Sequence, residues 1–142
     1  MSHGNSRGSA SVEAAIAVPA FALFVGLIIF GGRTAVVRHS VESAAADAAR
    51  AASILRVEKD AKNAAKDAAI TNLASQGINC LRVDVDIDTQ QFSHAVGTPA
   101  QVDVTVSCRL DLSDLSAPGV PGTRTISATM TSPIDSWRER SP

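Results

Sequence analysis

The chain has 142 residues with 13 basic and 14 acidic side chains, which gives a net charge of −1. One domain with a modest core is the expectation at this length. The near-zero charge removes the usual electrostatic case for a nucleic-acid partner, which needs a basic face. Aromatic residues make up only 4% of the chain, yet three of the four phenylalanines (Phe21, Phe24, Phe30) lie in one short stretch. That clustering is typical of a membrane segment rather than of a globular core.

Residues 14–32 (AAIAVPAFALFVGLIIFGG) contain no charged or strongly polar side chain. As a helix this run is about 28 Å long, close to the roughly 30 Å hydrocarbon core of a bilayer. A buried core helix is the alternative, but nothing later in the chain is apolar enough to surround it. We therefore predict a single transmembrane helix over residues 9–33, with membrane lipid around it.

A cleaved secretory signal is a second alternative, because Arg7 precedes the apolar run. Apolar regions of signal peptides usually have 7–15 residues and end at a small-x-small cleavage site. The run in this chain is longer, contains Pro19, and is followed by GGRT at residues 31–34. These features favour a retained helix, and cleavage near residues 34–35 is what a secreted protein would show.

Glu13 stands immediately before the apolar run. A carboxylate at the edge of a membrane helix is costly unless something neutralises it, so it is a candidate functional residue. The alternative is a structural role at the headgroup level, where Glu13 would complete a helix cap with Ser9 or Ser11.

The sequence GSASVEAAIAVP, residues 8–19, resembles the processing site of type IV pilin-like proteins. It is most similar to the TadE-like family of tight-adherence (Tad) pilus proteins, in which a prepilin peptidase cuts after a glycine at the cytoplasmic face. The resemblance implies a leader of residues 1–8 and cleavage between Gly8 and Ser9. Glu13 then becomes the fifth residue of the mature chain, as in the family.

Pro19, six residues after Glu13, is a further TadE-like feature, and it should bend the helix near its start. Cleavage would create an α-amino group at Ser9 that Glu13 can neutralise, in its own chain or in a neighbouring subunit. In a medium of low dielectric constant such a pairing favours helices docked in one axial register. Small residues would let these helices approach closely; they are Ala14, Ala15, Ala17, Ala20, Ala22 and Gly26.

The charges flanking the apolar run give a conflicting indication of orientation. Arg7 precedes the run, whereas Arg33, Arg38 and Arg50 follow it. Counted simply, this excess places the C-terminal side in the cytoplasm. The family resemblance implies the opposite, a cytoplasmic N-terminus and an extracytoplasmic head anchored in the cell (inner) membrane. We adopt the second orientation as our prediction.

An alanine-rich amphipathic helical region is predicted over residues 34–77. Its small apolar side chains recur at helical spacing, and alanine has the highest helix propensity. The charged patch at residues 56–60 interrupts the stripe, so we expect a bend there and a second helix that stops at Gly77.

Beyond Gly77 the apolar period changes from 3.6 to 2. Apolar and polar residues alternate over residues 81–87, 102–112 and 126–130, which predicts three half-buried strands. Turn-rich sequences at residues 93–99 and 113–123 separate them and favour an antiparallel arrangement.

The predicted fold is therefore α+β and pilin-like. A long N-terminal helix, membrane-spanning in its first half, precedes a second helical segment and a small three-stranded antiparallel sheet. The β head is expected over residues 78–132, and residues 133–142 form a tail in which Trp137 docks on the head or on a partner.

Two cysteines, Cys80 before the first strand and Cys108 in the second, are candidates for a disulfide. Such a bond would contribute roughly 3–4 kcal/mol to a small head in the chain-entropy model, and it would place the head outside the cytoplasm. Two free buried thiols are the alternative, because Cys108 is on the apolar face of its strand.

No catalytic or cofactor motif is visible in the sequence. Asp84, Asp86 and Asp88 alternate with apolar residues, and the glycine and glutamate that an EF-hand loop requires are absent. The chain has three histidines, His3, His39 and His94. None of them is at metal-ligand spacing from a cysteine or a carboxylate residue. We therefore predict no enzyme activity, no cofactor and no metal.

The resemblance implies a minor pseudopilin of a Tad pilus or secretion system that acts in pilus assembly and adhesion. Its expected partners are the prepilin peptidase, other pilin-like subunits and the Tad assembly machinery. The alternative is a membrane-anchored extracytoplasmic binding domain unrelated to pili, in which Gly8 and Glu13 are coincidental.

Overall fold

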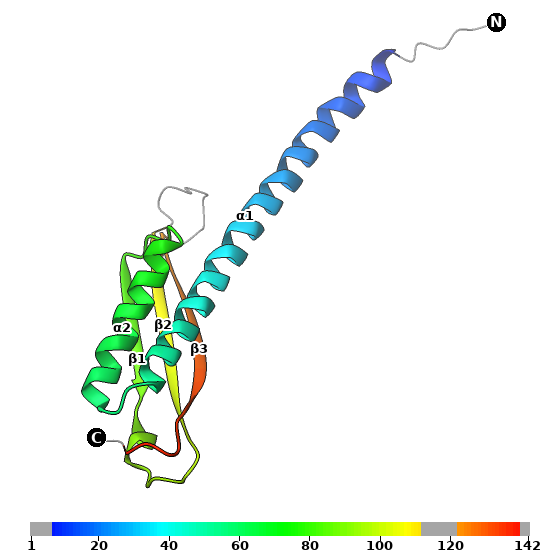
Figure 1. Ribbon diagram of the computed structural model, residues 1–142. Helices are drawn as coiled ribbons and strands as arrows, with labels where there is room; N and C mark the ends of the chain where they lie inside the picture. The colour runs from blue at the N-terminus through cyan, green and yellow to red at the C-terminus, as the bar shows by residue number, and fades with distance from the viewer. Residues whose placement is uncertain (1–6, 112–121, 140–142) are drawn as a thin grey trace, which may run out of the picture. The chain divides into compact units, whose positions relative to one another are not determined.

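A computed structural model describes residues 7–111 and 122–139 of the chain. Two helices are followed by three strands and a short 3₁₀ helix (Figure 1). In chain order the elements are α1 (Arg7–Ser53), α2 (Glu58–Ser75), β1 (Arg82–Asp88), η1 (Gln90–Ser93), β2 (Ala100–Asp111) and β3 (Thr123–Ile134). The predicted α+β fold class, with a long N-terminal helix, a second helix and a three-stranded antiparallel sheet, is confirmed.

The chain divides into two compact units, residues 1–36 and residues 37–142. In the first unit the described part of α1 is apolar, and its side chains from Val12 to Gly32 are exposed. By length and composition α1 is able to cross a membrane, and none of its most apolar window is buried within the protein.

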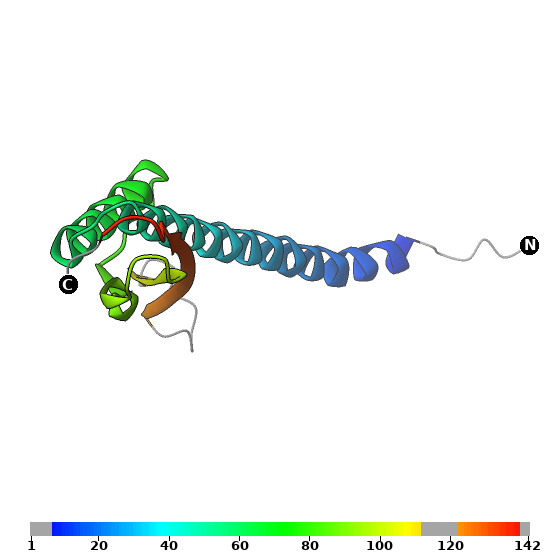
Figure 2. The same cartoon turned by 60° about the horizontal axis from the view of Figure 1, so that its bottom comes forward.

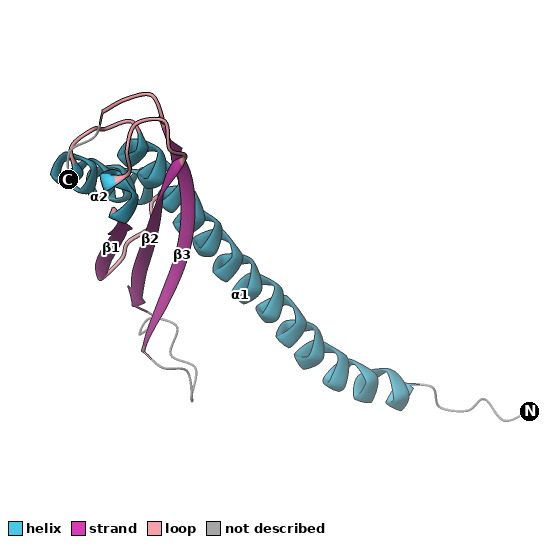
Figure 3. Ribbon diagram, turned by 90° about the horizontal axis from the view of Figure 1, so that it is seen from below, coloured by secondary structure: helices cyan, strands magenta, loops and turns pink. Residues whose placement is uncertain are grey.

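The second unit contains the sheet, in the strand order β1-β2-β3 (Figure 3). Both strand pairs are antiparallel, and Val85, Val106 and Ala128 stand opposite one another at the middle of the sheet. The register of β2 with β3 runs from Ala100↔Ile134 to Asp111↔Thr123 without interruption. Alternate residues therefore face the core and the solvent along every strand.

The core of this unit lies between the sheet and the two helices, which cover the same sheet face (Figure 2). The helices contribute mostly alanine to this core. The buried helix residues are Val41, Ala44, Ala45, Ala48, Ala49 and Ala52 from α1 and Ala61, Ala65, Ala69 and Leu73 from α2. The opposing layer is formed by Phe92, Val102, Val104, Val106 and Cys108.

The helical region is interrupted between Ser53 and Glu58, next to the charged patch where a bend was predicted. At the other end of α2, Gly77 has φ 69° and accepts the left-handed conformation that L side chains disfavour. The Gly77 N–H donates to the Ala74 carbonyl (3.0 Å) and the Ile78 N–H to the Leu73 carbonyl (3.0 Å), the pattern of a Schellman cap.

Polar contacts join the two helices. The Asn72 amide nitrogen donates to a carboxylate oxygen of Asp47, and it lies 3.4 Å from the Ser43 hydroxyl. Because Ser43 and Asp47 belong to α1 and Asn72 to α2, these contacts fix the two alanine stripes side by side.

The structure extends β3 beyond the strand predicted at residues 126–130. It reaches Ile134, two residues into the predicted tail, and the Ile134 side chain is buried. Pro133 pairs with Gln101, which is tolerated because β3 is an edge strand and one side of it needs no ladder hydrogen bonds. Most of the predicted turn at residues 113–123 and the leader residues 1–6 lie outside the described residues.

The alanine stripe generates a testable prediction. Replacing Ala48, which is fully buried in the core, with leucine should lower the free energy of unfolding by about 1–3 kcal/mol, because a filled core has no room for a larger side chain. Ala46, exposed on the same helix, provides the matched control, and Ala46→Leu should change stability by less than about 0.5 kcal/mol. Denaturant unfolding of the detergent-solubilised chain measures both; equal effects would contradict the packing described.

Candidate processing and assembly site

The candidate processing motif is at the start of α1. The described helix begins at Arg7, so the peptide bond between Gly8 and Ser9 is in its first turn in the uncut chain. Glu13 follows one turn further along and is exposed. The other residues of the predicted leader, 1–6, are outside the described part of the chain.

Glu13 has no hydrogen-bond or ion-pair partner among the side chains that the structure describes, those of residues 12–32, 34–111 and 122–139. α1 has no acidic residue in its first turn, so the Glu13 carboxylate lies beyond the position of an N-terminal capping side chain in the uncut chain. The carboxylate is therefore available for a group that the described side chains do not supply.

Pro19 is inside α1, and the helix continues through it to Ser53. Gly26, about two helix turns beyond Pro19, leaves a gap in the side-chain surface, and a Cβ atom added there would meet nothing within 4 Å. The result is a shallow apolar depression along one helix face, lined by Pro19, Ala22, Leu23, Gly26, Leu27 and Phe30. A depression of this kind fits the close approach of another apolar helix.

The large apolar side chains of this segment are among the most exposed in the described chain. Phe21 is 69% exposed, Leu23 71% and Leu27 68%. Contiguous apolar surface of this extent is unfavourable in water and indicates contact with lipid or with other apolar helices.

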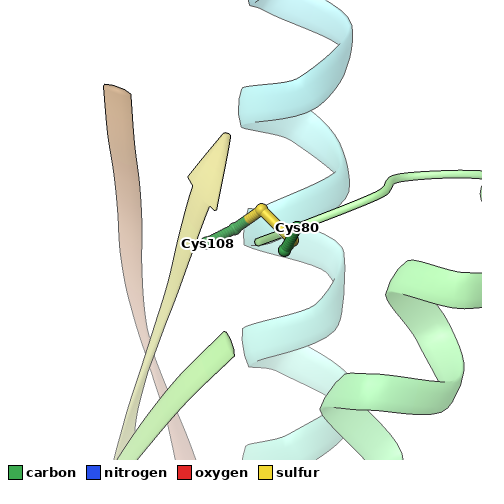
Figure 4. Close-up of a disulfide and its surroundings, with 2 residues drawn as sticks. All are labelled: Cys80 and Cys108. Carbon is green, nitrogen blue, oxygen red and sulfur yellow. A yellow bond between two sulfur atoms is a disulfide. The ribbon is translucent and has the colours of Figure 1, made fainter. Parts of the chain in front are cut away.

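In the head, Cys80 and Cys108 are joined by a disulfide with a Cα–Cα distance of 5.4 Å (Figure 4). Cys108 is fully buried on the inner face of β2, and Cys80 is half-buried in the segment that leads from α2 to β1. The backbone reinforces the connection, since the Leu81 N–H donates to the Arg109 carbonyl at 2.7 Å. The bond thus ties the end of the helical region to the central strand.

The three aspartates of β1 all lie on the exposed face of the sheet, while Val83, Val85 and Ile87 are half-buried. Asp84 pairs with Arg82 at 2.8 Å, and Asp88 accepts a hydrogen bond from the backbone N–H of Gln90 at 3.0 Å. In the described ranges, no three histidine, cysteine, aspartate or glutamate side chains are grouped as metal ligands would be.

The structure also contains a polar contact between α2 and the loop after β1, which the alternation of apolar and polar residues in the sequence did not indicate. The Thr89 hydroxyl donates to Glu58 Oε1 at 2.9 Å, and Lys62 also pairs with this carboxylate. The hydrogen bond from Lys62, and then that from Thr89, lower the pKa of Glu58 below its usual value. The Trp137 side chain, expected to dock on the head or on a partner, is 84% exposed.

The architecture defines a class of protein: an N-terminal helix of membrane length followed by a small disulfide-linked α+β head, as expected of a pilin-like chain. Residues 8–50 match the family model described as TadE-like protein, which confirms the resemblance predicted from Gly8, Glu13 and Pro19. The match ends inside α1, so the rest of the head lies outside it. No curated protein and no solved structure matches the chain.

The match covers residues 8–50, less than half of the chain, and all of these residues belong to α1. The TadE-like family is a structural and assembly family rather than a family of enzymes. A helix able to cross a membrane is consistent with membrane anchoring.

The disulfide generates a prediction about stability. Replacing both Cys80 and Cys108 with alanine should lower the free energy of unfolding of the oxidised chain by roughly 3–4 kcal/mol, because the unfolded chain is no longer cross-linked. Denaturant unfolding with and without a thiol reductant is the measurement. Reductant should destabilise the native chain and leave the double variant unchanged; a native chain indifferent to reductant would contradict the prediction.

Proposed function

We propose that this chain is a minor pseudopilin of a Tad pilus or secretion system and acts in pilus assembly. The single observation that carries the proposal is Glu13, an exposed carboxylate without a described partner, at the start of an exposed apolar helix within the TadE-like match. A prepilin peptidase removes residues 1–8, and the mature chain begins at Ser9.

Cleavage changes the charge at the helix start. The new α-amino group at Ser9 is four residues from Glu13, so a cation and an anion stand at the membrane boundary of the same helix. Each is costly to leave unpaired near hydrocarbon, and their attraction is much stronger there than in water. The Glu13 of one subunit therefore pairs with the Ser9 amine of another and aligns the two helices axially.

The helix face below this pair supports close packing. Ala22 and Gly26 expose the backbone in the depression that begins at Pro19, and Leu23 and Leu27 border it. Van der Waals contact between helices, rather than hydrophobic exclusion of water, stabilises such an assembly within a bilayer. Glu13 thus sets the register, and the depression supplies the contact area.

The head is extracytoplasmic in this proposal, and the protein is a single-pass protein of the cell (inner) membrane. The disulfide between Cys80 and Cys108 supports this orientation, because such bonds persist in oxidising compartments. The excess of arginines after the span opposes it under the positive-inside rule. Adhesion and secretion enter as processes of the assembled system, not as activities of this head.

Processing is tested by the two leader glycines. In cells with an active prepilin peptidase, intact mass and N-terminal sequencing of the membrane-extracted protein should show a chain starting at Ser9. Gly8→Leu should abolish cleavage, because in the family that the motif resembles the peptidase cuts after a glycine. Gly4→Leu, the matched control in the same leader, should be cut normally. A native chain that keeps Met1 or Ser2 would refute the proposed processing.

Assembly is tested at Glu13. Glu13→Ala should leave membrane insertion intact and reduce co-purification with other pilin-like subunits by at least about tenfold, the effect of losing roughly 1.4 kcal/mol. Glu42→Ala, a change of the same kind after the apolar run, should have little effect on assembly. Equal behaviour of the two variants would exclude the proposed role of Glu13.

The alternative is an anchored extracytoplasmic binding domain with no connection to assembly. It predicts an uncut chain and no assembly defect in Glu13→Ala. A secreted protein would instead be cut near residues 34–35, which N-terminal sequencing of the same sample detects.

A further inference from the structure

The two bonded cysteines of the head differ in exposure. Cys108 is fully buried in the core, on the inner face of β2. Cys80 is only half-buried and lies among residues 78–81, which belong to no helix or strand (Figure 4). Its neighbours Asn79 and Leu81 are exposed, Leu81 to 58%. The bond therefore has one end near solvent, at Cys80, and one end inside the core.

Backbone contacts hold the two cysteines together without the help of the bond. β1, which follows Cys80, pairs along its whole length with β2, which contains Cys108. The Leu81 N–H donates to the Arg109 carbonyl at 2.7 Å, so the residue directly after Cys80 is anchored to the residue directly after Cys108. The Cα–Cα distance of 5.4 Å lies within the range of about 4.4–6.8 Å that disulfides usually show. None of these backbone contacts uses a sulfur atom, so the reduced head keeps the two thiols within bonding reach.

The other end of this segment is fixed by the end of α2. The Ile78 N–H donates to the Leu73 carbonyl at 3.0 Å, and the half-buried Ile78 side chain packs against the core. Cys80 thus lies two residues after one anchor and one residue before the other. A segment so short loses little further chain entropy when the bond closes.

The chemistry of exchange favours Cys80 as the first sulfur to react. Exchange begins when a thiolate attacks a sulfur of another disulfide, and it passes through a mixed disulfide. A thiolate is costly to form in apolar surroundings, and Cys108 belongs to a core cluster of apolar side chains. Near solvent, water stabilises a thiolate at Cys80. In the reduced, folded head Cys80 is therefore the thiol able to attack a disulfide from outside.

We propose that Cys80 is the site at which the folded, reduced head receives its disulfide from another protein, a thiol oxidase that carries a reactive disulfide. The Cys80 thiolate attacks one sulfur of that disulfide, and the second sulfur of the oxidase leaves as a thiolate. Cys108 then attacks Cys80 Sγ, and the first sulfur of the oxidase leaves. Two electrons pass to the oxidase, and the protons of the two cysteines end on its two thiols.

Closure inside the folded head offsets the burial of Cys108. The second step takes place within one molecule, so the effective concentration of the Cys108 thiol at Cys80 is far above that of any external thiol. The compartment that holds the oxidase follows from the extracytoplasmic head of the proposed function. The unequal reactivity of the two sulfurs does not depend on that function.

The reduced native chain in bilayer discs provides the first test. Under anaerobic conditions, a short pulse of iodoacetamide followed by peptide mass spectrometry measures the alkylation rate of each cysteine. Cys80 should react at least about 100-fold faster than Cys108, because Cys108 reacts only when the head opens. Urea below the unfolding transition should accelerate Cys108 and leave Cys80 nearly unchanged. Equal rates at the two cysteines would overturn the proposal.

Two single-cysteine variants form a matched pair for the second test. Cys108→Ala keeps the thiol of Cys80, and Cys80→Ala keeps that of Cys108. Oxidised protein disulfide isomerase is a probe of protein size, and acid quenching followed by mass spectrometry detects the mixed disulfide. Cys108→Ala should form this species at least about 100-fold faster than Cys80→Ala. Circular dichroism compares the fold of each variant with that of the native chain.

The same quench on the reduced native chain should find the isomerase attached at Cys80, and attachment at Cys108 would overturn the proposal. Reaction of Cys80 with glutathione disulfide but not with the isomerase would overturn the assignment to a partner protein. The alkylation test needs no substitution, so it stands even where a variant fails to fold. Cleavage at Gly8 and the Glu13 phenotype are unaffected by any of these results, so failure here is distinguishable from failure of the proposed function.

Discussion

One carboxylate at the end of an apolar helix constrains the rest of this molecule. The side chains of the described apolar run are exposed, so the helix requires lipid or other helices around it. Glu13 requires a counter-charge in that same setting, and no described residue provides one. Cleavage after Gly8 would supply the missing cation at Ser9. In our account assembly therefore depends on processing.

The head satisfies a different constraint, a core built mainly from alanine and valine. Each of these side chains buries little apolar area, so the core gains less hydrophobic stabilisation per residue than a core of larger side chains would. Other contacts add to it: Asn72 and Asp47 join the two helices, the cap at Gly77 ends α2, and the disulfide ties the segment after α2 to β2. A small core of this kind also leaves the inward-facing residues of β3, Ile126, Ala128 and Met130, only half-buried.

Much of the fold could be predicted because each element has a distinct period. The charge-free run identified the apolar helix, the alanine stripe identified the two covering helices, and alternation identified the three strands. Glu13 and Pro19 could be assigned to a TadE-like motif because they stand at fixed distances from Gly8, and the family match confirms the resemblance.

Other features depend on tertiary contacts, which leave no periodic pattern in the sequence. The extension of β3 to Ile134 was hidden by Pro133, which reads as a strand terminator unless the strand is known to lie at an edge. Phe92 is buried from a short 3₁₀ helix of four residues, and Thr89 reaches Glu58 across 31 positions of sequence. Local sequence gives no indication of such contacts, because the packing of distant elements creates them.

The central claim is that the Ser9 amine of one chain pairs with the Glu13 carboxylate of another. A zero-length carbodiimide cross-linker joins only groups already in contact, so it tests this claim directly on the mature protein in membranes. Samples mixed from unlabelled and ¹⁵N-labelled chains distinguish bonds between chains from bonds within one chain. Our account predicts a mixed-isotope peptide linking the Ser9 N-terminus to Glu13, and its absence from assembled, cleaved protein would contradict the account.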